Sequence, residues 1–519
     1  MLAIHRTIKI LLAIKLFFMA STASAVINQS NHKLSQRFYT KVSFPYKGKN
    51  APHKVIYGND NYGYYSTQSF YLKNNKIHIN LMPPGYKYKI SFFKPQRKRN
   101  AKKMQIIGRK KFTSPLPKIF KSQRGYLKHG RFSSNYFIVS GALARGKYWN
   151  PHFISTNPDI YKKSQYRFTF TLILNRLGEI VWVHIPKHQD ELFQTYVATK
   201  PLKKGTYGVL LGKQAGFFQV VRYDGRVIKE LRSRDVENPF TMHHDFLYTS
   251  NESIYAISSR AAKTRTLKAK RLGKSFLSDT IIKVNLHKGK HRKVIDFLKY
   301  YKPDTNPFYT GDDKGDHKFV LWNKEKVDFD FLHINTIEES NEGYLLGIRN
   351  LNKVIMMDRS FSRIKWSLGW DKKSTFQIKR EKDRFYHIHT PIKTKSGNIM
   401  VFDNGYKNAR SRIVEYVLDY NKKEAKKAWS FEPKPRLYSK DRGSISILKN
   451  RNVVAYFVSP EKGSQKAPEE PPKDYILEID RKNGHEKARM LRRFEVMSPG
   501  YRAIPINELG RETYIGSRL

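Results

Sequence analysis

Apolar runs that end in Asp or Asn and resume after a short turn recur along the chain from about residue 165. The turns are rich in Asp, Asn and Gly, which tolerate the positive φ angles that tight turns require. Because each turn separates two strand-like runs, each copy is predicted to be a β-hairpin. The six copies are centred on Asn175, Asp224, Asn285, Asp358, Asp419 and Asp480.

The spacing of these hairpins predicts how they are arranged. Successive copies lie 49 to 73 residues apart, with further strand-like runs between them. This pattern is typical of the four-stranded blades of a β-propeller. We therefore predict an all-β protein in which residues 131–519 form a six-bladed β-propeller. A pair of β-sandwiches and a seven-bladed ring with one degenerate blade are the competing architectures.

Residues 26–130 have a different composition, rich in Tyr, Lys and Asn. Alternating runs at 76–81 and 86–93, on either side of a Pro-Pro-Gly turn, are typical of strands. We predict a small N-terminal β domain here, with a boundary near residue 130. A basic cluster at 97–111 is either a solvated loop or a surface for polyanions or membranes.

The first 25 residues resemble a secretory signal peptide. His5, Arg6 and Lys9 precede an apolar stretch at 10–20, and an Ala-Ser-Ala cleavage site occupies 23–25. We therefore expect a periplasmic or otherwise exported protein. The alternative is an uncleaved N-terminal anchor.

Composition narrows the classes of function. The chain has 99 Lys and Arg against 43 Asp and Glu, a formal net charge of +56, yet 39% of it is hydrophobic and 13% aromatic. It can therefore bury cores, and its surface must attract polyanions or small anions. The absence of cysteine excludes a disulfide scaffold, a cysteine nucleophile and thiolate metal sites.

Three histidines recur at a similar phase of the repeat. His244 and His389 each lie eight residues before the Glu or Gly of the following turn, and His333 lies ten before. Ligands of propellers bind where the innermost strands converge, so a shared phase predicts a shared site. His243 and His387 adjoin this set and either join it or point to the other face of the strand.

Two arginines also recur at one phase. Arg260 and Arg349 lie 16 residues after His244 and His333, respectively. Imidazole and guanidinium groups that meet on one axis would bind a sulfate, phosphate or carboxylate. A metal site is the alternative, but no carboxylate joins the histidines at a metal-ligand spacing. We predict no metal and no cofactor.

The stretches that carry these residues resemble the bacterial arylsulfotransferases. They read MHHDFL at 242–247, DFLHINTIEE at 330–339, GYLLGIRNLNKVIMMDR at 343–359 and, most specifically, HTPIKTKSGNIMVFDNGYKNARSRIVEYVLD at 389–419. The resemblance covers roughly 165–519. It implies an exported six-bladed propeller that transfers a sulfuryl group from a phenolic sulfate ester to a phenol without the nucleotide donor PAPS.

The resemblance also implies roles for single residues. The family's nucleophilic histidine falls on His389, its supporting histidines on His244 and His333, its essential arginine on Arg349, and the Asn of its LHxN phrase on Asn335. A neutral imidazole suits the first role because it is a good nucleophile at neutral pH and a good leaving group. His387, two positions from His389, is the rival nucleophile.

Catalysis is therefore predicted for His389, His333, His244 and Arg349, and substrate binding for Asn335, His243 and Arg260. The expected partners are a phenolic sulfate donor and a phenol acceptor. An anionic cell surface or a second copy of the chain are further options. A non-catalytic exported propeller that binds anionic ligands is the alternative function. A nucleic-acid partner is not expected, since the signal peptide opposes it.

Overall fold

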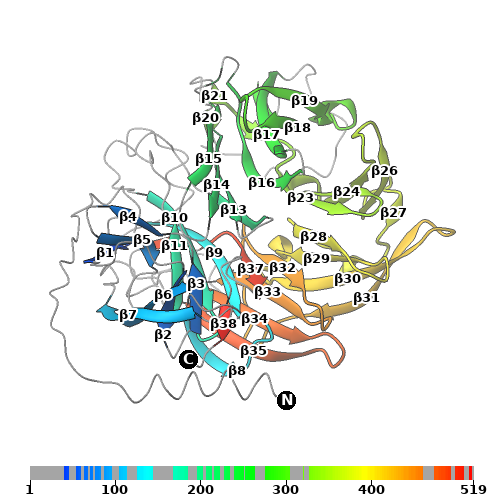
Figure 1. Cartoon of the computed structure of the whole chain (residues 1–519). Coiled ribbons are helices and arrows are strands. Elements are labelled where there is room, and N and C mark those ends of the chain that lie inside the picture. Colours follow the sequence, from blue (N-terminus) through cyan, green and yellow to red (C-terminus); the bar gives the residue numbers. More distant parts are fainter. Residues whose placement is uncertain are drawn as a thin grey trace. The chain divides into compact units, whose positions relative to one another are not determined.

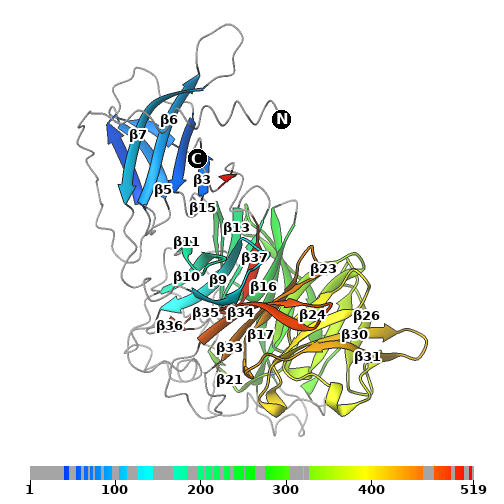
Figure 2. The same cartoon turned by 90° about the horizontal axis from the view of Figure 1, so that it is seen from below.

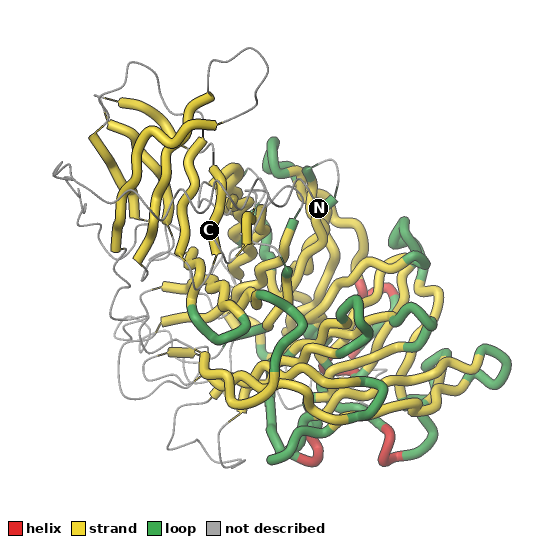
Figure 3. Tube along the Cα trace, turned by 60° about the horizontal axis from the view of Figure 1, so that its bottom comes forward, coloured by secondary structure: helices red, strands yellow, loops and turns green. Residues whose placement is uncertain are grey.

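The described residues are built almost entirely of β-strands. The computed structural model describes 40–45, 54–59, 63–67, 70–73, 76–82, 87–95, 104–113, 125–143, 168–184, 196–202, 206–212, 216–222, 227–233, 236, 239–249, 252–263, 275–303, 319–320, 326–459, 473–492, 497–498, 500–507 and 514–516. The predicted signal peptide and most of the basic cluster lie outside these residues. Strands dominate the described chain, and short 3₁₀ turns are its helical elements (Figure 3). The all-β prediction is confirmed.

The chain divides into two compact units, between residues 117 and 118. The first unit holds two antiparallel sheets. One consists of β1 (Thr40–Pro45), β5 (Lys76–Met82) and β4 (Phe70–Lys73), and the other of β38 (Tyr514–Gly516), β3 (Gly63–Thr67), β2 (Lys54–Asn59), β6 (Lys87–Pro95) and β7 (Met104–Thr113).

These units differ from the predicted boundary near 130 and from a single domain over 131–519. β8 (Gly125–Gly130) belongs to the second unit because it pairs with a strand close to the C-terminus. β38 belongs to the first unit because it pairs with β3.

The second unit contains, within its described residues, six consecutive antiparallel sheets of the meander type. The first three are β9 (Tyr136–Leu143), β10 (Phe168–Asn175) and β11 (Ile180–His184); β12 (Tyr196–Pro201), β13 (Thr206–Gly212), β14 (Phe217–Arg222) and β15 (Val227–Arg232); and β16 (His243–Tyr248), β17 (Ser253–Lys263), β18 (Ser275–Asn285) and β19 (His291–Asp296). β36 (Met497–Ser498) and β37 (Ala503–Ile506) pair with β9.

The last three meanders follow the same order. They are β23 (Ile334–Ser340), β24 (Gly343–Ile348), β25 (Lys353–Met357) and β26 (Ile364–Gly369); β28 (His389–Lys393), β29 (Ile399–Asp403), β30 (Arg412–Asp419) and β31 (Glu424–Phe431); and β32 (Ser444–Ile447), β33 (Val453–Ser459), β34 (Lys473–Asp480) and β35 (His485–Arg492), extended by β8. β27 (Phe376–Gln377) joins β26 to β31 (Figure 2).

Short elements complete the second unit. β20 (Phe319–Val320) pairs with β21 (Lys326–Val327), and β22 (Phe329–Asp330) runs parallel to β18. The 3₁₀ turns are η4 (Phe297–Lys299), η6 (Arg349–Leu351), η7 (Glu381–Asp383) and η8 (Tyr406–Asn408).

All six predicted hairpins are present, each joining the last two strands of its own meander. Five of the Asp or Asn side chains that were used to find them accept backbone N–H groups of the turn, and at Asn285, Asp419 and Asp480 the donor is two residues on. An Asx turn of this kind fixes the reversal locally, which is why the sequence could show it.

The inner strands of the meanders form a closed ring of contacts. β9 contacts β12, β12 contacts β16, and the ring continues through β23, β28, β32 and β37 back to β9. Figure 1 shows β16, β23, β28, β32 and β37 around a common centre. Apolar side chains fill the space between neighbouring sheets, so that Ile257 and Leu346 share one core and Leu345 and Val401 the next.

Candidate active site

The histidines lie where the inner strands begin. β16 begins at His243 and β28 at His389, while His333 directly precedes β23. Each of these strands has a register shift close to its start. His244, His333 and Thr390 have positive φ angles of 57°, 54° and 45°. Such angles cost a non-glycine residue about 1–3 kcal/mol and concentrate at functional sites.

His244, His333 and His389 are brought together, as their shared phase predicted. The ring centroids of His244 and His333 are 4.7 Å apart. Tyr501 lies between them and His389, with ring centroids 5.7 Å from His244 and 6.0 Å from His389. The C-terminal segment that carries Tyr501 therefore completes the cluster.

His389 is fully buried, and its neighbour Asn404 fixes its tautomer. The Asn404 amide donates to the carbonyl oxygens of Ser439 (2.6 Å) and Arg442 (2.8 Å). Its Oδ1 must therefore accept a hydrogen from His389 Nδ1, at 2.7 Å. Neutral His389 consequently has no hydrogen on Nε2, and that atom has no hydrogen-bond partner among the described residues.

The surroundings of His389 keep it uncharged. Burial lowers the pKa of His389 to about 3. The hydrogen bond to Asn404 opposes this shift, and the nearby cations Arg349 and Arg502, together with His333, add to it. The ring is therefore a neutral nucleophile at any physiological pH.

Arg349 is buried close to the cluster. It occupies the first position of η6, directly after β24, and its backbone N–H donates to the carbonyl oxygen of His333. Its guanidinium Nη1 donates to Asn350 Oδ1 at 2.6 Å. Asn350 in turn donates to the backbone of Asp330. This turn therefore ties the guanidinium to the segment that carries His333.

His333 has a carboxylate partner. Its Nδ1 lies 2.8 Å from Asp330 Oδ2. An ionised carboxylate accepts hydrogen bonds only, so Nδ1 carries a hydrogen. The pair stabilises a positive charge on the His333 ring.

Asn335 is fully buried and holds the cluster together. Its Nδ2 donates to the carbonyl oxygen of Ile388 at 2.7 Å, and its Oδ1 accepts from Thr336 at 3.0 Å. The amide therefore links the start of β23 to the backbone that precedes His389. This placement differs from a role in substrate binding, because both ends of the amide are occupied by the protein.

His243 also has both ring nitrogens engaged. Its Nδ1 lies 2.6 Å from His244 Nδ1, and its Nε2 lies 2.7 Å from Ser259 Oγ and 3.3 Å from Asp279 Oδ1. Predicted as a substrate-binding residue, it instead faces Asp279, because β16 turns its first side chain toward β17 and β18.

Arg260 is not brought into the cluster. Its guanidinium donates to Asp296 at 2.9 and 2.6 Å, and its side chain is 44% exposed. The matching offset from a histidine was misleading because β17 continues as a strand through Lys263, whereas β24 ends at Ile348 and turns into η6. The two arginines therefore occupy different environments.

His387 lies apart from His389, the other nucleophile that the sequence allowed. Its φ of 57° interrupts the extended chain, and its ring packs against Tyr406 with centroids 4.5 Å apart. Because the strand begins only at His389, the two rings do not share a face.

Sequence reasoning missed Asn404, Tyr501 and a buried ion network. Arg502 donates to Asp245 at 2.9 Å and to the carbonyl oxygen of Asn335 at 2.6 Å. Lys200 also pairs with Asp245, at 2.9 Å. Burial opposes ionisation of Asp245, but Arg502 and Lys200 outweigh it and hold the pKa of its carboxyl below the usual value.

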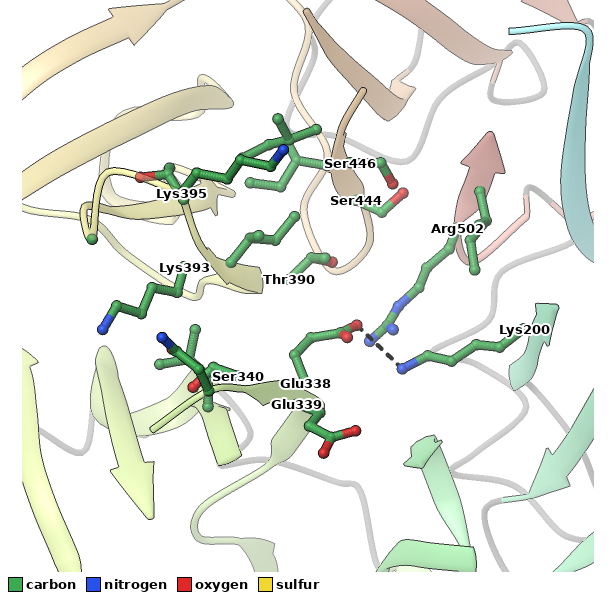
Figure 4. A pocket seen from close by; sticks show the side chains of 18 of the residues that line it. Lys200, Glu338, Glu339, Ser340, Thr390, Lys393, Lys395, Ser444, Ser446 and Arg502 are labelled. Carbon is green, nitrogen blue, oxygen red and sulfur yellow. Dashed lines mark hydrogen bonds and ion pairs between the residues drawn. The ribbon is translucent and has the colours of Figure 1, made fainter. Parts of the chain in front are cut away.

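A cavity of about 900 Å³ lies at the far ends of β23 and β28, where Glu338 and Lys393 line it. In Figure 4, Lys200, Glu338 and Arg502 point toward one another within it. None of the predicted site residues lines this cavity among the described residues. The layer formed by Thr390 and Arg502 separates it from the histidines, so we place the candidate chemistry at the histidine end.

Two searches among the described residues bear on other kinds of site. They contain no group of three or more His, Asp or Glu side chains arranged to hold a metal ion. No helix among them is both long and apolar enough to cross a bilayer.

Comparisons with known proteins give one functional match. The sequence profile described as Arylsulfotransferase (ASST) matches residues 130–502. No curated protein matches the chain.

Comparisons with solved structures give only distant likenesses. A protein of unknown function from Bacteroides caccae is 14% identical over 72% of this chain and 100% of its own, with a TM-score of 0.39. A chain of a nidogen/laminin complex is 8% identical over 70% and 97%, with a TM-score of 0.33. An oligogalacturonate lyase in complex with manganese is 7% identical over 72% and 97%, with a TM-score of 0.32.

Proposed function

The chain belongs to the arylsulfotransferase family, and from that premise we propose that it transfers a sulfuryl group from a phenolic sulfate ester to a phenol through a sulfohistidine on His389. The supporting observation is the state of His389: a buried neutral ring whose hydrogen is held on Nδ1 by Asn404. The lone pair of Nε2 is thereby available to attack sulfur.

The first half-reaction breaks the bond between sulfur and the phenolic oxygen. His389 Nε2 forms a bond to sulfur, and the phenolate leaves with the electron pair. Negative charge on the sulfuryl oxygens is stabilised by Arg349 and by the His333 ring that Asp330 supports. One of His244 and His333 donates a proton to the leaving phenolate.

The second half-reaction reverses these steps with a different phenol. The same histidine takes the proton of the acceptor hydroxyl, the phenolate oxygen attacks sulfur, and His389 leaves as a neutral imidazole. Because donor product departs before the acceptor binds, ping-pong kinetics follow. The chemistry requires no cofactor.

The architecture belongs to the same proposal. We propose that the six meanders are the blades of a six-bladed β-propeller, on whose axis the histidines lie, and that the protein is exported. The closed ring of inner strands and the order of the meanders support the first point. The sequence of residues 1–25 supports the second.

A chromogenic assay tests the proposed reaction. The protein is incubated with 4-nitrophenyl sulfate and phenol, and nitrophenol release is compared between wild type and His389→Asn. We expect release by the wild type alone, at a rate that depends on the acceptor. If the wild type releases no nitrophenol with any acceptor in a panel of phenols, the enzymatic proposal fails for this donor, and binding of anionic ligands becomes the better account.

A further inference from the structure

His244, His243, Ser259 and Asp279 form a continuous chain of hydrogen bonds that leads away from the histidine cluster. The chain runs from His244 Nδ1 to His243 Nδ1 (2.6 Å), and from His243 Nε2 to Ser259 Oγ (2.7 Å) and Asp279 Oδ1 (3.3 Å). The Asp279 carboxyl is 1% exposed. A buried carboxylate behind two linked imidazoles is not required by the fold, because apolar side chains could fill this space.

The hydrogens in this chain have definite positions. Ser259 donates to Asp279 Oδ1 at 2.8 Å, and the backbone N–H of Ile334 donates to Asp279 Oδ2 at 2.6 Å. Burial opposes ionisation of Asp279, but the hydrogen bond and charge of His243 and the bonds from Ile334 and Ser259 outweigh it and lower the pKa of the carboxyl. Asp279 is therefore an acceptor, and His243 Nε2 carries a hydrogen.

The tautomer of His244 follows from that of His243. When His243 is neutral with its hydrogen on Nε2, its Nδ1 has a lone pair and must accept from His244 Nδ1. Neutral His244 then has no hydrogen on Nε2. The other ring, His333, is held directly by Asp330 and is suited to keeping a positive charge.

We propose that His243 and Asp279 are positioning residues that set the protonation of His244, and that His244 rather than His333 exchanges the proton with the phenols. The assignment rests on the proposed function. It chooses between two histidines that the sequence and the family resemblance leave equivalent.

The proton balance is as follows. A proton taken from the acceptor phenol binds His244 Nε2, while the hydrogen on His244 Nδ1 crosses the 2.6 Å bond to His243 Nδ1. The positive charge then resides on His243, next to Asp279 and away from Arg349 and Arg502. In the donor half-reaction the two hydrogens move back, and the leaving phenolate takes the proton from His244 Nε2.

Asp279→Asn inverts this arrangement. The Ile334 N–H requires the oxygen of the new amide to face it, so the NH₂ group faces His243 and Ser259. His243 Nε2 must then accept, His243 Nδ1 donates to His244, and His244 Nε2 acquires a hydrogen. A catalytic histidine forced into the wrong tautomer loses about 10⁴ in turnover in a serine protease, and we expect a loss of the same order in the acceptor step.

The test measures the two half-reactions separately, with 4-nitrophenyl sulfate and phenol. Nitrophenolate leaves readily without a proton, so Asp279→Asn is expected to release a burst of one nitrophenol per chain and then stall as the sulfohistidine. Asp296→Asn is the matched control, since it removes a carboxyl of the same sheet that pairs with Arg260. It should turn over as the wild type does.

Each outcome decides the assignment. A stalled burst in Asp279→Asn, with the control normal, supports it. Turnover at the wild-type rate, or loss of the burst together with turnover in a folded variant, overturns it. A stalled burst in Asp330→Asn alone would assign the proton to His333. If Asp279→Asn does not fold, His243→Phe, which removes the acceptor of His244 Nδ1, is expected to stall in the same way.

A readout that does not need activity separates this inference from the proposed function. Nitrogen-15 NMR of histidine-labelled protein reports which ring nitrogens carry hydrogen. We expect neutral His244 with its hydrogen on Nδ1 in the wild type and on Nε2 in Asp279→Asn. If the wild type gives no burst, the proposed function fails, and these spectra alone decide whether the relay exists. A His244 tautomer that does not change in the variant would contradict it.

Discussion

The two ring nitrogens of His389 have different surroundings, and this difference defines what the residue can do. Nδ1 donates to Asn404, whose own amide hydrogens are held by Ser439 and Arg442. Nε2 is buried and has no hydrogen-bond partner among the described residues. A ring fixed in this way presents a lone pair in a constant direction, at no further cost in ordering.

Removing the orienting amide should slow the first half-reaction. In Asn404→Ala, the His389 Nδ1–H and two carbonyl oxygens lose their partner. Each lost buried hydrogen bond costs about 1–3 kcal/mol, which corresponds to a rate loss of about 5- to 150-fold. The rate of the nitrophenol burst checks this. An unchanged burst rate would mean that Asn404 does not orient the ring.

The pKa of His389 predicts how stability depends on pH. The folded pKa of about 3 lies below the usual 6.5. The unfolded chain therefore binds the proton first as the pH falls, and stability is lost between about pH 6.5 and pH 3. From pH 7 to pH 5 this group should cost about 2 kcal/mol of unfolding free energy.

Urea unfolding of the wild type and His389→Asn at both pH values isolates that contribution, because the variant lacks it. The wild type should lose about 2 kcal/mol more than the variant between pH 7 and pH 5. Equal losses in the two proteins would show that His389 is not held neutral by burial.

At the scale of elements, the part of the fold that was predictable is the part that is local. Each hairpin turn is fixed by an Asp or Asn within a few residues of the strands that it joins, so the sequence displays it directly. Asn404 and Arg502 were not predictable, because their partners are brought near by sheet register and ring closure. Arg260 shows the reverse error: an identical offset places two arginines differently when one strand continues and the other ends.

Two glycines with positive φ separate the effect of backbone conformation from that of space. Gly130 ends β8 with φ +74°, and a Cβ there would lie 1.9 Å from the carbonyl oxygen of Lys487 on β35. Gly397 has φ +88° with no atom within 4 Å of that position. Gly397→Ala should therefore cost only the left-handed conformation, about 1–2 kcal/mol.

Gly130→Ala should cost clearly more than Gly397→Ala, because β8 must shift away from β35. Equilibrium unfolding of both variants measures the difference. Equal costs would mean that the pairing of β8 with β35 adapts without loss.

At the scale of the whole molecule, both ends of the second unit's chain close the ring. β8 adds to the last meander, and β37 adds to the first. The segment before β37 also delivers Tyr501 and Arg502 to the cluster. The site is therefore complete only when the ring is closed. The net charge of +56 exceeds what this site uses, and the structure explains only its few buried members.

The ion network predicts a large contrast between two arginines. Arg502→Met leaves the buried Asp245 with Lys200 as its only cationic partner and should cost about 3–5 kcal/mol. Arg260→Met breaks the half-exposed pair with Asp296 and should cost at most about 1 kcal/mol, with turnover retained. Unfolding and nitrophenol assays check both. Comparable losses in the two variants would contradict the placement of Arg502.

The central claim is that His389 carries the sulfuryl group between the two phenols. The most direct measurement is mass spectrometry, under mildly alkaline conditions, of protein mixed with 4-nitrophenyl sulfate in the absence of acceptor. The account predicts one sulfuryl adduct, located on His389, that is discharged by phenol and absent from His389→Asn but present in His243→Phe. An adduct on His387 or on another residue, or turnover without any adduct, would contradict it.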